Sequence, residues 1–470
     1  MIHEFLLLMK HELLLCILLF FILILKIADH KKSNDQWILI VSGLLLFNFI
    51  AGFFWNSGGE LFNGMFLLNE LTIFQKNILN LGILVVSLQA QPYLKTHRHV
   101  PEFYMLLIST LIGMFFMISS GNLLLFYIGL EMATIPLAAM VNFNLKDRNS
   151  SEAGMKMILS SAFSSAILLL GISLVYGLTG SLSFVEISTH LTDTSLLLFA
   201  FVLLFTGFAF KLSAVPFHFW TADVYEGSPA VVAAYLSVVS KASIAFVFIS
   251  VLYHVFGSLE NIWYGIIFVT AVLTIGIGNL FAIRQDNLKR FLAFSSIAQV
   301  GFILIGISSG TQNGEAAVIY FLLIYLFSNL GAFGVVTLVS AISEKEKISD
   351  YKGFYKTNPV LTWVLTLSLF SLAGIPPTAG FFGKFFLLMA GAAHGNYLLV
   401  GFAAINMIIS MYYYLRIVKA MFMDVNESPI ERIKIDLLPS ISLLICILGL
   451  LVTGFAGTLY SYIQNLSAGI

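Results

Sequence analysis

The sequence predicts an all-α polytopic membrane protein. Of its 470 residues, 59% are hydrophobic and 10% are charged, whereas charged residues make up roughly a quarter of a typical soluble domain. Apolar runs of about 20 residues, the length that crosses a bilayer as a helix, recur along the whole chain. Two of these runs are interrupted by proline and glycine. These observations exclude a soluble globular enzyme.

The apolar runs indicate about fourteen membrane helices, because a helix rises ~1.5 Å per residue through ~30 Å of hydrocarbon. The first run carries Glu12 and shows no A-x-A cleavage pattern before Asp29, so we expect a retained helix rather than a signal peptide. The expected helices lie near residues 5–27, 36–55, 66–91, 101–119, 121–144, 151–177, 194–222, 228–256, 260–283, 288–309, 315–342, 360–390, 397–421 and 437–463.

The basic residues of the loops predict the orientation of these helices. If helices alternate in direction, loop Lys and Arg all fall on one side, and the opposite loops (55–69, 119–122, 177–195, 257–261, 309–315 and 391–397) hold none. By the positive-inside rule the charged loops are cytoplasmic, and we expect both termini to be periplasmic. The basic loop positions are 26, 31, 32, 95, 98, 146, 148, 284, 290, 345, 347, 352, 356, 419, 432 and 434.

Charge and cysteine usage predict no nucleic-acid, metal or disulfide chemistry. The 24 Lys and Arg balance 24 Asp and Glu, so net charge favours no acidic partner. Cys16 and Cys446 stand far apart in apolar runs, without metal or iron–sulfur spacing. His218 has no HxH or HxxxH partner, and we expect it to line a proton path rather than bind a metal.

Eight basic residues fall inside the predicted helices or at their edges, where a charge costs at least ~2.5–3.5 kcal/mol at mid-bilayer. Four of them are close enough to helix ends for their side chains to reach water. The other four, with Glu131 at similar depth, predict a polar path through the interior; for each one alone, the alternative is a structural ion pair. The first four are Lys10, Lys76, Lys289 and Arg416, and the second four are Lys156, Lys211, Lys241 and Lys384.

Two helices are predicted to be broken, at FKLSAVPFHFW around Pro216 and at LAGIPPTAGFFGK around Pro376. Proline removes a backbone donor, and unwound backbone within a membrane must be buried in protein or line a wet cavity. Broken helices at corresponding positions indicate an inverted-repeat transporter. We therefore expect a three-helix segment at 1–100, two inverted five-helix repeats at 101–256 and 260–423, and a C-terminal helix at 424–470.

Three long motifs resemble the antiporter-like membrane subunits of respiratory complex I. They are KLSAVPFHFWTADVYEGSPAVVAAYLSVVSKAS, DNLKRFLAFSSIAQVGF and LAGIPPTAGFFGKF. Within that family, the DVYEGSP segment and the Lys in GFFGK are most similar to the subunit N group of bacterial NADH–quinone oxidoreductases. The resemblance covers the whole chain.

The resemblance implies a set of proton-path residues. Gln299 stands where the family usually has His, Phe294 replaces a common Tyr, and Ala222 a common Pro. Because Gln does not take up a proton, a shuttle at that position has to be water or another residue. The implied path residues are Glu131, Lys156, Lys211, Lys241 and Lys384, supported by Glu152 (an i,i+4 partner of Lys156), His218 and Lys289.

The function that the resemblance implies is proton translocation across a bacterial inner membrane, driven by electron transfer from NADH to quinone in partner subunits. FMN, iron–sulfur clusters and quinone are expected in those partners, with no redox centre or cofactor in this chain. The expected partners are the other membrane subunits, through them the hydrophilic NADH-oxidising arm, and lipid. Movement of Glu131 relative to Lys211 would switch Lys211 between holding and releasing a proton, and Lys241 would pass it on to Lys384.

Three other readings remain open. A subunit of a multisubunit cation/proton antiporter shares the broken helices, and a membrane-bound hydrogenase subunit would have a nickel–iron partner. A scaffold that transports nothing belongs to a different class, and the buried lysines argue against it.

Overall fold

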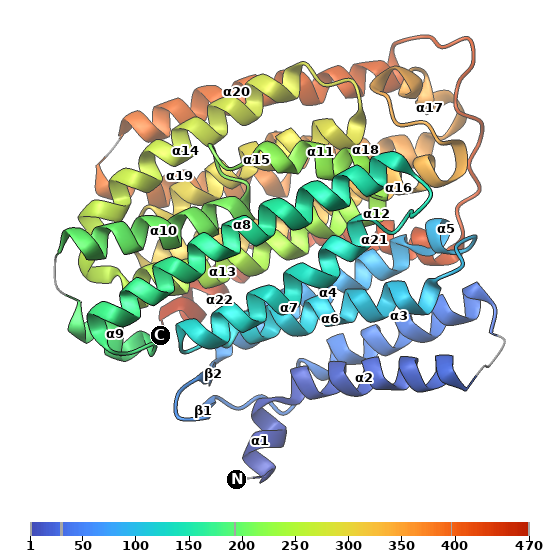
Figure 1. The fold of residues 1–470 in the computed structure, drawn as a ribbon. Coiled ribbons are helices and arrows are strands. Elements are labelled where there is room, and N and C mark those ends of the chain that lie inside the picture. Colours follow the sequence, from blue (N-terminus) through green and yellow to red (C-terminus); the bar gives the residue numbers. More distant parts are fainter. Residues whose placement is uncertain (1, 29–31, 192–193, 396, 469–470) are drawn as a thin grey trace. The chain divides into compact units, whose positions relative to one another are not determined.

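The computed structural model describes residues 2–28, 32–191, 194–395 and 397–468 (Figure 1). Lys31, one of the basic loop positions, lies outside them. The chain forms two compact units. Unit 1 comprises Met1–Ser87, His97–Leu212 and Val239–Trp263, and unit 2 comprises Leu88–Thr96, Ser213–Val238 and Tyr264–Ile470.

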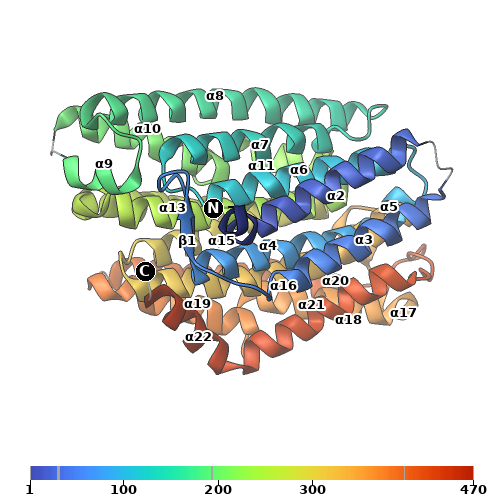
Figure 2. The same cartoon turned by 90° about the horizontal axis from the view of Figure 1, so that it is seen from below.

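Unit 1 is built from helices and one short hairpin, in which β1 pairs antiparallel with β2. Helix α6 contacts α2, α3, α7 and α13, and α8 packs against α7 and α10. Figure 2 shows α8 at the edge of this unit. The elements are α1 (Ile2–Leu8), α2 (Lys10–Ile27), α3 (Asn34–Ala51), β1 (Gly59–Leu61), β2 (Phe66–Leu68), α4 (Glu70–Gln89), α6 (Val100–Ile118), α7 (Leu123–Val141), α8 (Arg148–Thr179), α9 (Phe184–His190), α10 (Ser195–Leu212) and α13 (Lys241–Ser250).

Unit 2 is organised around α16, which is the most completely buried of the membrane-length helices described and contacts α12, α15, α18, α19, α21 and α22. The elements are α5 (Gln91–Leu94), α11 (Phe219–Gly227), α12 (Ala230–Tyr235), α14 (Glu260–Ile283), α15 (Leu288–Ile307), α16 (Gln312–Ser343), α17 (Phe354–Thr357), α18 (Pro359–Ala373), α19 (Ala379–Gly391), α20 (Tyr397–Phe422), α21 (Leu437–Phe455) and α22 (Gly457–Ala468).

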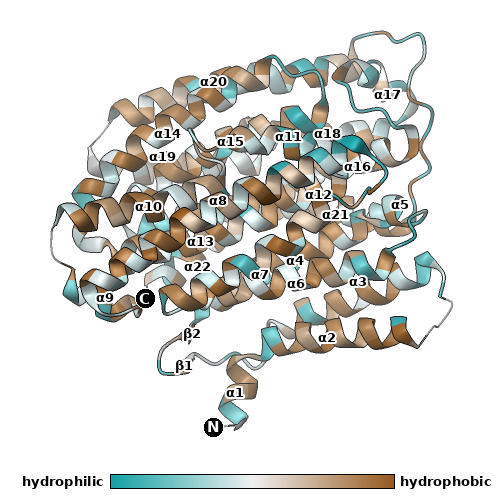
Figure 3. Ribbon diagram, in the orientation of Figure 1, coloured by the Kyte–Doolittle hydropathy of each residue, from teal (hydrophilic) through white to brown (hydrophobic). Residues whose placement is uncertain are grey.

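Twelve helices of the described residues are long and apolar enough to cross a membrane, and Figure 3 shows hydrophobic residues along their lengths. The expected count of about fourteen is not confirmed by length and composition. Helix α2 carries Lys10, Glu12 and Lys26, and the run expected at 360–390 is the two shorter helices α18 and α19. The prediction of a multi-pass, almost entirely helical membrane protein is confirmed.

Several expected helix boundaries are wrong. The run at 5–27 is divided at Met9 into α1 and α2. The run at 66–91 begins as strand β2, and the one at 437–463 is divided into α21 and α22. Hydropathy averaged over a membrane-length window does not distinguish these breaks, because the few polar residues at them, such as Lys10 and Glu70, lie between apolar runs.

Both predicted helix breaks are present. Helix α10 ends at Leu212, and Ser213 adopts a left-handed conformation with φ 66°. Helix α18 ends at Ala373, and Gly374 has φ 79°, which glycine adopts without a Cβ clash. The peptide bonds Val215–Pro216 and Pro376–Pro377 are cis. Each break leaves backbone groups that need partners inside the protein.

Helices α6 and α7 cross in close contact at Gly113 and Gly129. A Cβ on Gly129 would lie 2.7 Å from the amide nitrogen of Met117, which is closer than real Cβ atoms approach. This crossing holds the segment of α7 that carries Glu131.

We expect Gly129→Ala to destabilise the protein by about 1–3 kcal/mol, because the added methyl group forces α6 and α7 apart. Gly177→Ala in α8 is the matched control, since a Cβ there meets nothing within 4 Å and alanine favours a helix. The measurement is the thermal unfolding midpoint of the purified complex carrying each variant. Equal midpoints would contradict the close crossing.

Candidate functional site

Three of the predicted path lysines lie inside their units, as expected. Lys211 is the penultimate residue of α10, Lys241 begins α13, and Lys384 lies in α19. The exposed fractions of Lys241 and Lys384 are 2% and 1%. Lys241 and Lys384 are therefore removed from water and depend on polar groups of the protein, whereas Lys211 is partly buried.

Lys211 binds a hydroxyl rather than a carboxylate. Its Nζ donates to Oγ1 of Thr134 at 3.1 Å. Thr134 lies three residues after Glu131 on α7, so both face the same side of that helix. Glu131 is half-buried, and its Oε1 has no hydrogen-bond partner among the described residues. No ion pair within 4.0 Å joins Glu131 to Lys211 in the described chain, so the carboxylate and the ammonium are neighbours without direct contact.

Glu131 also reaches the outer side of unit 1. It lines a shallow hollow between α6 and α7 whose other walls are mostly apolar. Glu131 therefore shares a helix face with Thr134, the acceptor of Lys211, and also lines this hollow. The hollow is lined by Ser109, Tyr127, Ile128, Glu131, Met132, Ile135 and Pro136.

Lys241 follows directly after an irregular turn. Residues Leu236–Ser240 form a π-helical turn, and α13 starts at Lys241. Such turns are rare and occur often at functional sites, where they redirect a side chain. Helices α10 and α13 pack through Phe208 and Phe248, whose ring centroids are 4.9 Å apart, so Lys211 and Lys241 lie on neighbouring helices.

Lys384 is held by the second helix break. Its Nζ donates to the carbonyl oxygens of Leu372 at 2.7 Å and Ala373 at 3.4 Å, and it lies 4.7 Å from the ring centroid of Phe302. These carbonyls end α18, where the break leaves them without helix partners. The break thus supplies the oxygen atoms that a buried ammonium group requires.

Gln299 shares this acceptor. Its Nε2 donates to the Leu372 carbonyl at 2.9 Å and lies 3.2 Å from the hydroxyl of Tyr414, while its Oε1 has no partner among the described residues. The Tyr414 hydroxyl is also 2.5 Å from Oγ of Ser295. Gln299 is therefore placed beside Lys384, in a polar cluster that includes Tyr414, which the sequence analysis did not single out.

A second polar group runs through α16 and was also missed. Asn329 donates to Oγ of Ser237 at 2.9 Å and to the hydroxyl of Tyr325 at 2.8 Å. The hydroxyls of Ser328 and Ser371 are 2.7 Å apart. The sequence feature that could have predicted this polar group is the row of Tyr, Ser and Asn residues in α16, a helix that is buried throughout.

The expected interior position of Lys156 is wrong. Its ammonium group is 2.7 Å from Glu152, as the i,i+4 spacing predicted, but the side chains are 43% and 58% exposed. They lie on the outer face of α8, whose opposite face packs against α7 and α10. The sequence did not distinguish the outer face of α8, because its buried face also carries polar residues such as Ser161 and Ser164.

Lys289 and Arg290 connect α15 to the segment after the first break. Lys289 is 6% exposed; it forms an ion pair with Glu346 at 2.8 Å and donates to the Ser228 carbonyl at 3.2 Å. The Nη1 of Arg290 binds Asp223 at 2.7 Å and Glu226 at 2.8 Å. The acids of the DVYEGSP motif therefore anchor α11. Lys289 is bound in protein rather than extended to water.

His218 stands in the break itself. It is 5% exposed, its Nδ1 has no partner among the described residues, and its ring lies against Phe219 with centroids 4.4 Å apart. No group of three or more His, Cys, Asp or Glu side chains able to hold a metal occurs in the described part of the chain. The chemistry that the arrangement supports is the movement of protons between buried amines, hydroxyls and a carboxylate.

The sequence analysis did not identify two buried acids, Glu12 and Glu315. Glu12 forms an ion pair at 2.6 Å with Lys76, which was expected near a helix end and is fully buried. Glu315, in the first turn of α16, is 6% exposed. Each of these acids lies within an apolar run, and the sequence analysis predicted a site residue from that pattern only at Glu131.

Comparison with known proteins identifies relatives over the whole chain. The family described as NADH:quinone oxidoreductase/Mrp antiporter, transmembrane, matches residues 120–410. NADH-quinone oxidoreductase subunit N of Phocaeicola vulgatus is 47% identical over 92% of this chain and 93% of its own length.

Among solved structures, a chain of respiratory complex I from Thermus thermophilus superposes with a TM-score of 0.83 at 26% identity, covering 96% of this chain and 98% of that one. A chain of the Mrp complex from a Dietzia species has a TM-score of 0.87 at 20% identity, covering 98% and 96%, and shares the fold. The chain therefore belongs to the NADH:quinone oxidoreductase/Mrp antiporter family of membrane subunits, among the relatives of subunit N.

Proposed function

We propose that the chain is the proton-translocating membrane subunit of a bacterial NADH-quinone oxidoreductase. The observation that carries this proposal is a set of buried lysines at helix breaks in a chain whose relatives are named subunit N of that complex. Electron transfer from NADH to quinone, with FMN and iron–sulfur clusters, takes place in partner subunits. This chain contributes no redox centre.

The first step is a switch between Glu131 and Lys211. With the carboxylate withdrawn, Lys211 has only the Thr134 hydroxyl as an acceptor. A carboxylate ~5 Å from an ammonium group favours its protonated form by about 3 kcal/mol at an effective dielectric of 20, which equals about two pH units. Movement of Glu131 toward Lys211 therefore loads the lysine, and movement toward the outer hollow releases its proton.

In the following steps the proton passes to Lys241 and then to Lys384, which opens toward the periplasm. His218, Lys289 and Gln299 support this series. Gln299 cannot carry the proton itself, but it donates to the Leu372 carbonyl that also accepts from Lys384, and to the Tyr414 hydroxyl. Glu152 and Lys156 act from the outer face of α8.

The finer organisation belongs to the same proposal. We infer about fourteen membrane helices, with a three-helix segment at 1–100, inverted five-helix repeats at 101–256 and 260–423, and a last helix at 424–470. The two interrupted helices support this repeat. The chain lies in the bacterial inner membrane with both termini periplasmic. Its partners are the other membrane subunits, through them the hydrophilic arm, and lipid.

A subunit of a multisubunit cation/proton antiporter is the second candidate, favoured by the fold shared with the Mrp complex. A membrane-bound hydrogenase subunit is the third. The closer agreement in sequence with subunit N favours the first proposal. Sodium-dependent transport without NADH-oxidising partners would favour the antiporter.

Glu131 and Lys211 are expected to behave as one functional unit. Lys211→Ala and Glu131→Gln should each cause a strong loss of proton pumping, and the double variant should pump no less than Lys211→Ala, because the carboxylate acts through the lysine. Lys211→Arg should also fail, since a guanidinium does not release its proton. The measurement is proton pumping against NADH oxidation in vesicles carrying the assembled complex. Normal pumping in Lys211→Ala, or additive losses, would reduce the site to a structural contact.

Thr134→Val tests the released position of Lys211. Removing the hydroxyl while keeping the shape takes away the observed acceptor, so the lysine should remain associated with Glu131 and pumping should slow. Thr206→Val, in α10 with its hydroxyl bound to the Val202 carbonyl, is the control. Equal pumping rates in the two threonine variants would argue against the switch.

Gln299→Leu should reduce pumping less than Lys241→Ala, because Gln299 positions groups near Lys384 whereas Lys241 carries the proton. The loss in Gln299→Leu should include weaker assembly, since the Tyr414 hydroxyl and the Leu372 carbonyl each lose a donor at about 1–3 kcal/mol. Pumping per NADH oxidised and the amount of assembled complex separate the two effects. Equal losses per assembled complex would remove the distinction between Lys241 and Gln299.

A further inference from the structure

The N-terminal helices of unit 1 contain an ion pair that the proposed proton series does not use. Nζ of Lys76, on α4, is 2.6 Å from Oε1 of Glu12, on α2, and the two side chains are 0% and 1% exposed. An ionisable pair within a membrane is costly, and its partners are held only when geometry and hydrogen bonding compensate for lost water. Oε2 of Glu12 has no hydrogen-bond partner in the described chain, so half of the carboxylate is uncompensated.

His11 stands beside this pair and is also unsatisfied. It is 0% exposed, and neither ring nitrogen has a partner among the described residues. Its ring meets Phe115 edge to face, with centroids 6.0 Å apart, and the charged groups that act on it are Lys76 and Lys10. Buried polar groups are nearly always hydrogen-bonded. A structural ion pair explains Glu12 and Lys76, but it does not explain a fully buried imidazole without partners.

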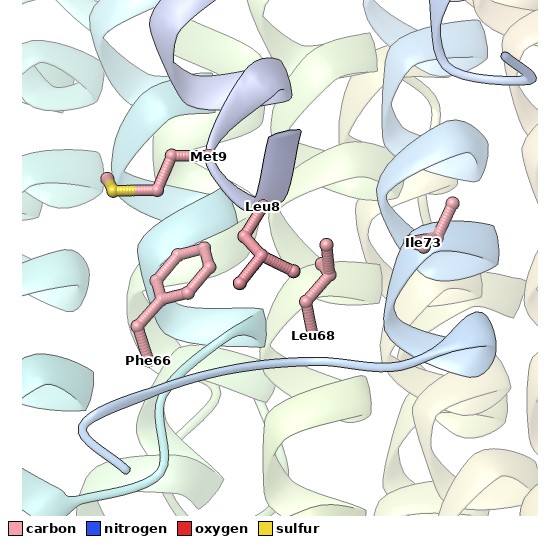
Figure 4. Close-up of a cluster of buried hydrophobic side chains, with 5 residues drawn as sticks. All are labelled: Leu8, Met9, Phe66, Leu68 and Ile73. Carbon is pink, nitrogen blue, oxygen red and sulfur yellow. The ribbon is translucent and has the colours of Figure 1, made fainter. Parts of the chain in front are cut away.

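An apolar cluster packs beside this ion pair. Figure 4 shows Leu8, Met9, Phe66, Leu68 and Ile73 packed together, from the α1–α2 junction, strand β2 and α4. The ring centroid of Phe66 lies 5.0 Å from Nζ of Lys76, and that of Phe115 lies 5.6 Å away. These rings stabilise the ammonium group while excluding water.

Lys10 provides a polar connection outward. It precedes His11 in the chain, and its Nζ donates to the Phe54 carbonyl and, at 2.6 Å, to Oδ1 of Asn56. On the other side, α6 contacts both α2 and α7, and α7 carries Glu131. Helix α6 therefore lies between α2, which carries His11 and Glu12, and α7, which carries Glu131 of the proposed switch.

We propose that His11, Glu12 and Lys76 form a second proton-binding site of this chain; the proposal rests on the proposed function. With Glu12 ionised, Lys76 charged and His11 neutral, the site has no net charge. It takes up one proton on a ring nitrogen of His11 and then carries one positive charge, which it loses when the proton leaves. Lys76 keeps its proton throughout and holds the carboxylate in place. Only N–H and O–H bonds form and break.

The charge-free double variant Glu12→Gln/Lys76→Met separates this site from a structural ion pair. Removing one charge alone leaves the other uncompensated in the interior, so the single variants should assemble poorly. The double variant removes both charges. A purely structural pair would then give normal assembly and normal pumping, whereas a proton-binding site gives an assembled complex that pumps fewer protons per NADH oxidised.

His11→Phe is the second variant, because an aromatic ring of similar size keeps the contact with Phe115 and cannot bind a proton. We expect normal assembly, normal NADH oxidation and a loss of pumping. Ser42→Ala is the control, since Ser42 is buried in the same segment, bound to Ser87 at 2.8 Å, and does not titrate. Normal pumping per assembled complex in His11→Phe overturns the proposal. This outcome decides the question even if the double variant does not assemble.

Infrared difference spectra of the complex on addition of NADH provide a readout that packing does not affect. Proton uptake should give an imidazolium band that is lost in His11→Phe and in Glu12→Gln/Lys76→Met, and an unchanged spectrum in His11→Phe overturns the proposal. Lys211→Ala in the same vesicles reports separately on the proposed function. If Lys211→Ala fails to pump and His11→Phe pumps normally, only the second proton-binding site is overturned. If Lys211→Ala pumps normally, the proposed function is overturned.

Discussion

The cost of holding an ammonium group in a low-dielectric interior constrains this structure more than any other interaction. A buried lysine has three N–H donors and no acceptor, so it must find oxygen atoms that a regular helix does not offer. The chain supplies them in three ways: a threonine hydroxyl for Lys211, carboxylates for Lys76 and Lys289, and carbonyls at a helix end for Lys384. A helix break would be unstable in lipid, but within the protein its free carbonyl groups can act as acceptors for a buried ammonium group, as they do for Lys384.

The ionic anchor of α11 shows how a short helix is kept in register after a break. Nine residues form too little helix to be stable alone. Asp223 and Glu226 lie three residues apart and therefore on one face, where both bind Arg290. Asn287 caps the same end of α15 by accepting from the amides of Lys289 and Arg290. The position of His218 in the break thus depends on interactions at the opposite end of α11.

Much of the fold follows from the sequence, because membrane helices and their breaks are local properties. Apolar length predicted the spans, and proline with glycine predicted both interruptions near Lys211 and Lys384. The interior-facing side of α8 was not predictable, since Glu152 and Lys156 obey the same i,i+4 geometry in lipid, in protein or in water. The pairing of Glu12 with Lys76 joins residues 64 positions apart, and such a contact is set by helix packing rather than by local pattern. Gln299 was predicted as a neutral position, but its place beside Lys384 depends on two helices meeting at one carbonyl.

That shared carbonyl has a consequence for the proposed proton series, in which Lys384 alternates between charged and neutral. A carbonyl oxygen has two lone pairs, and the one at Leu372 accepts from both the Lys384 amine and the Gln299 amide, whose charge is constant. When Lys384 becomes neutral, the backbone oxygen keeps the Gln299 donor and is never left bare in an apolar environment. Loss of the charge on Lys384 therefore leaves no unpaired carbonyl at Leu372 that would favour extension of α18 across the break. The protein backbone can remain fixed while the charge alternates, so at this point in the chain the moving part is the proton itself.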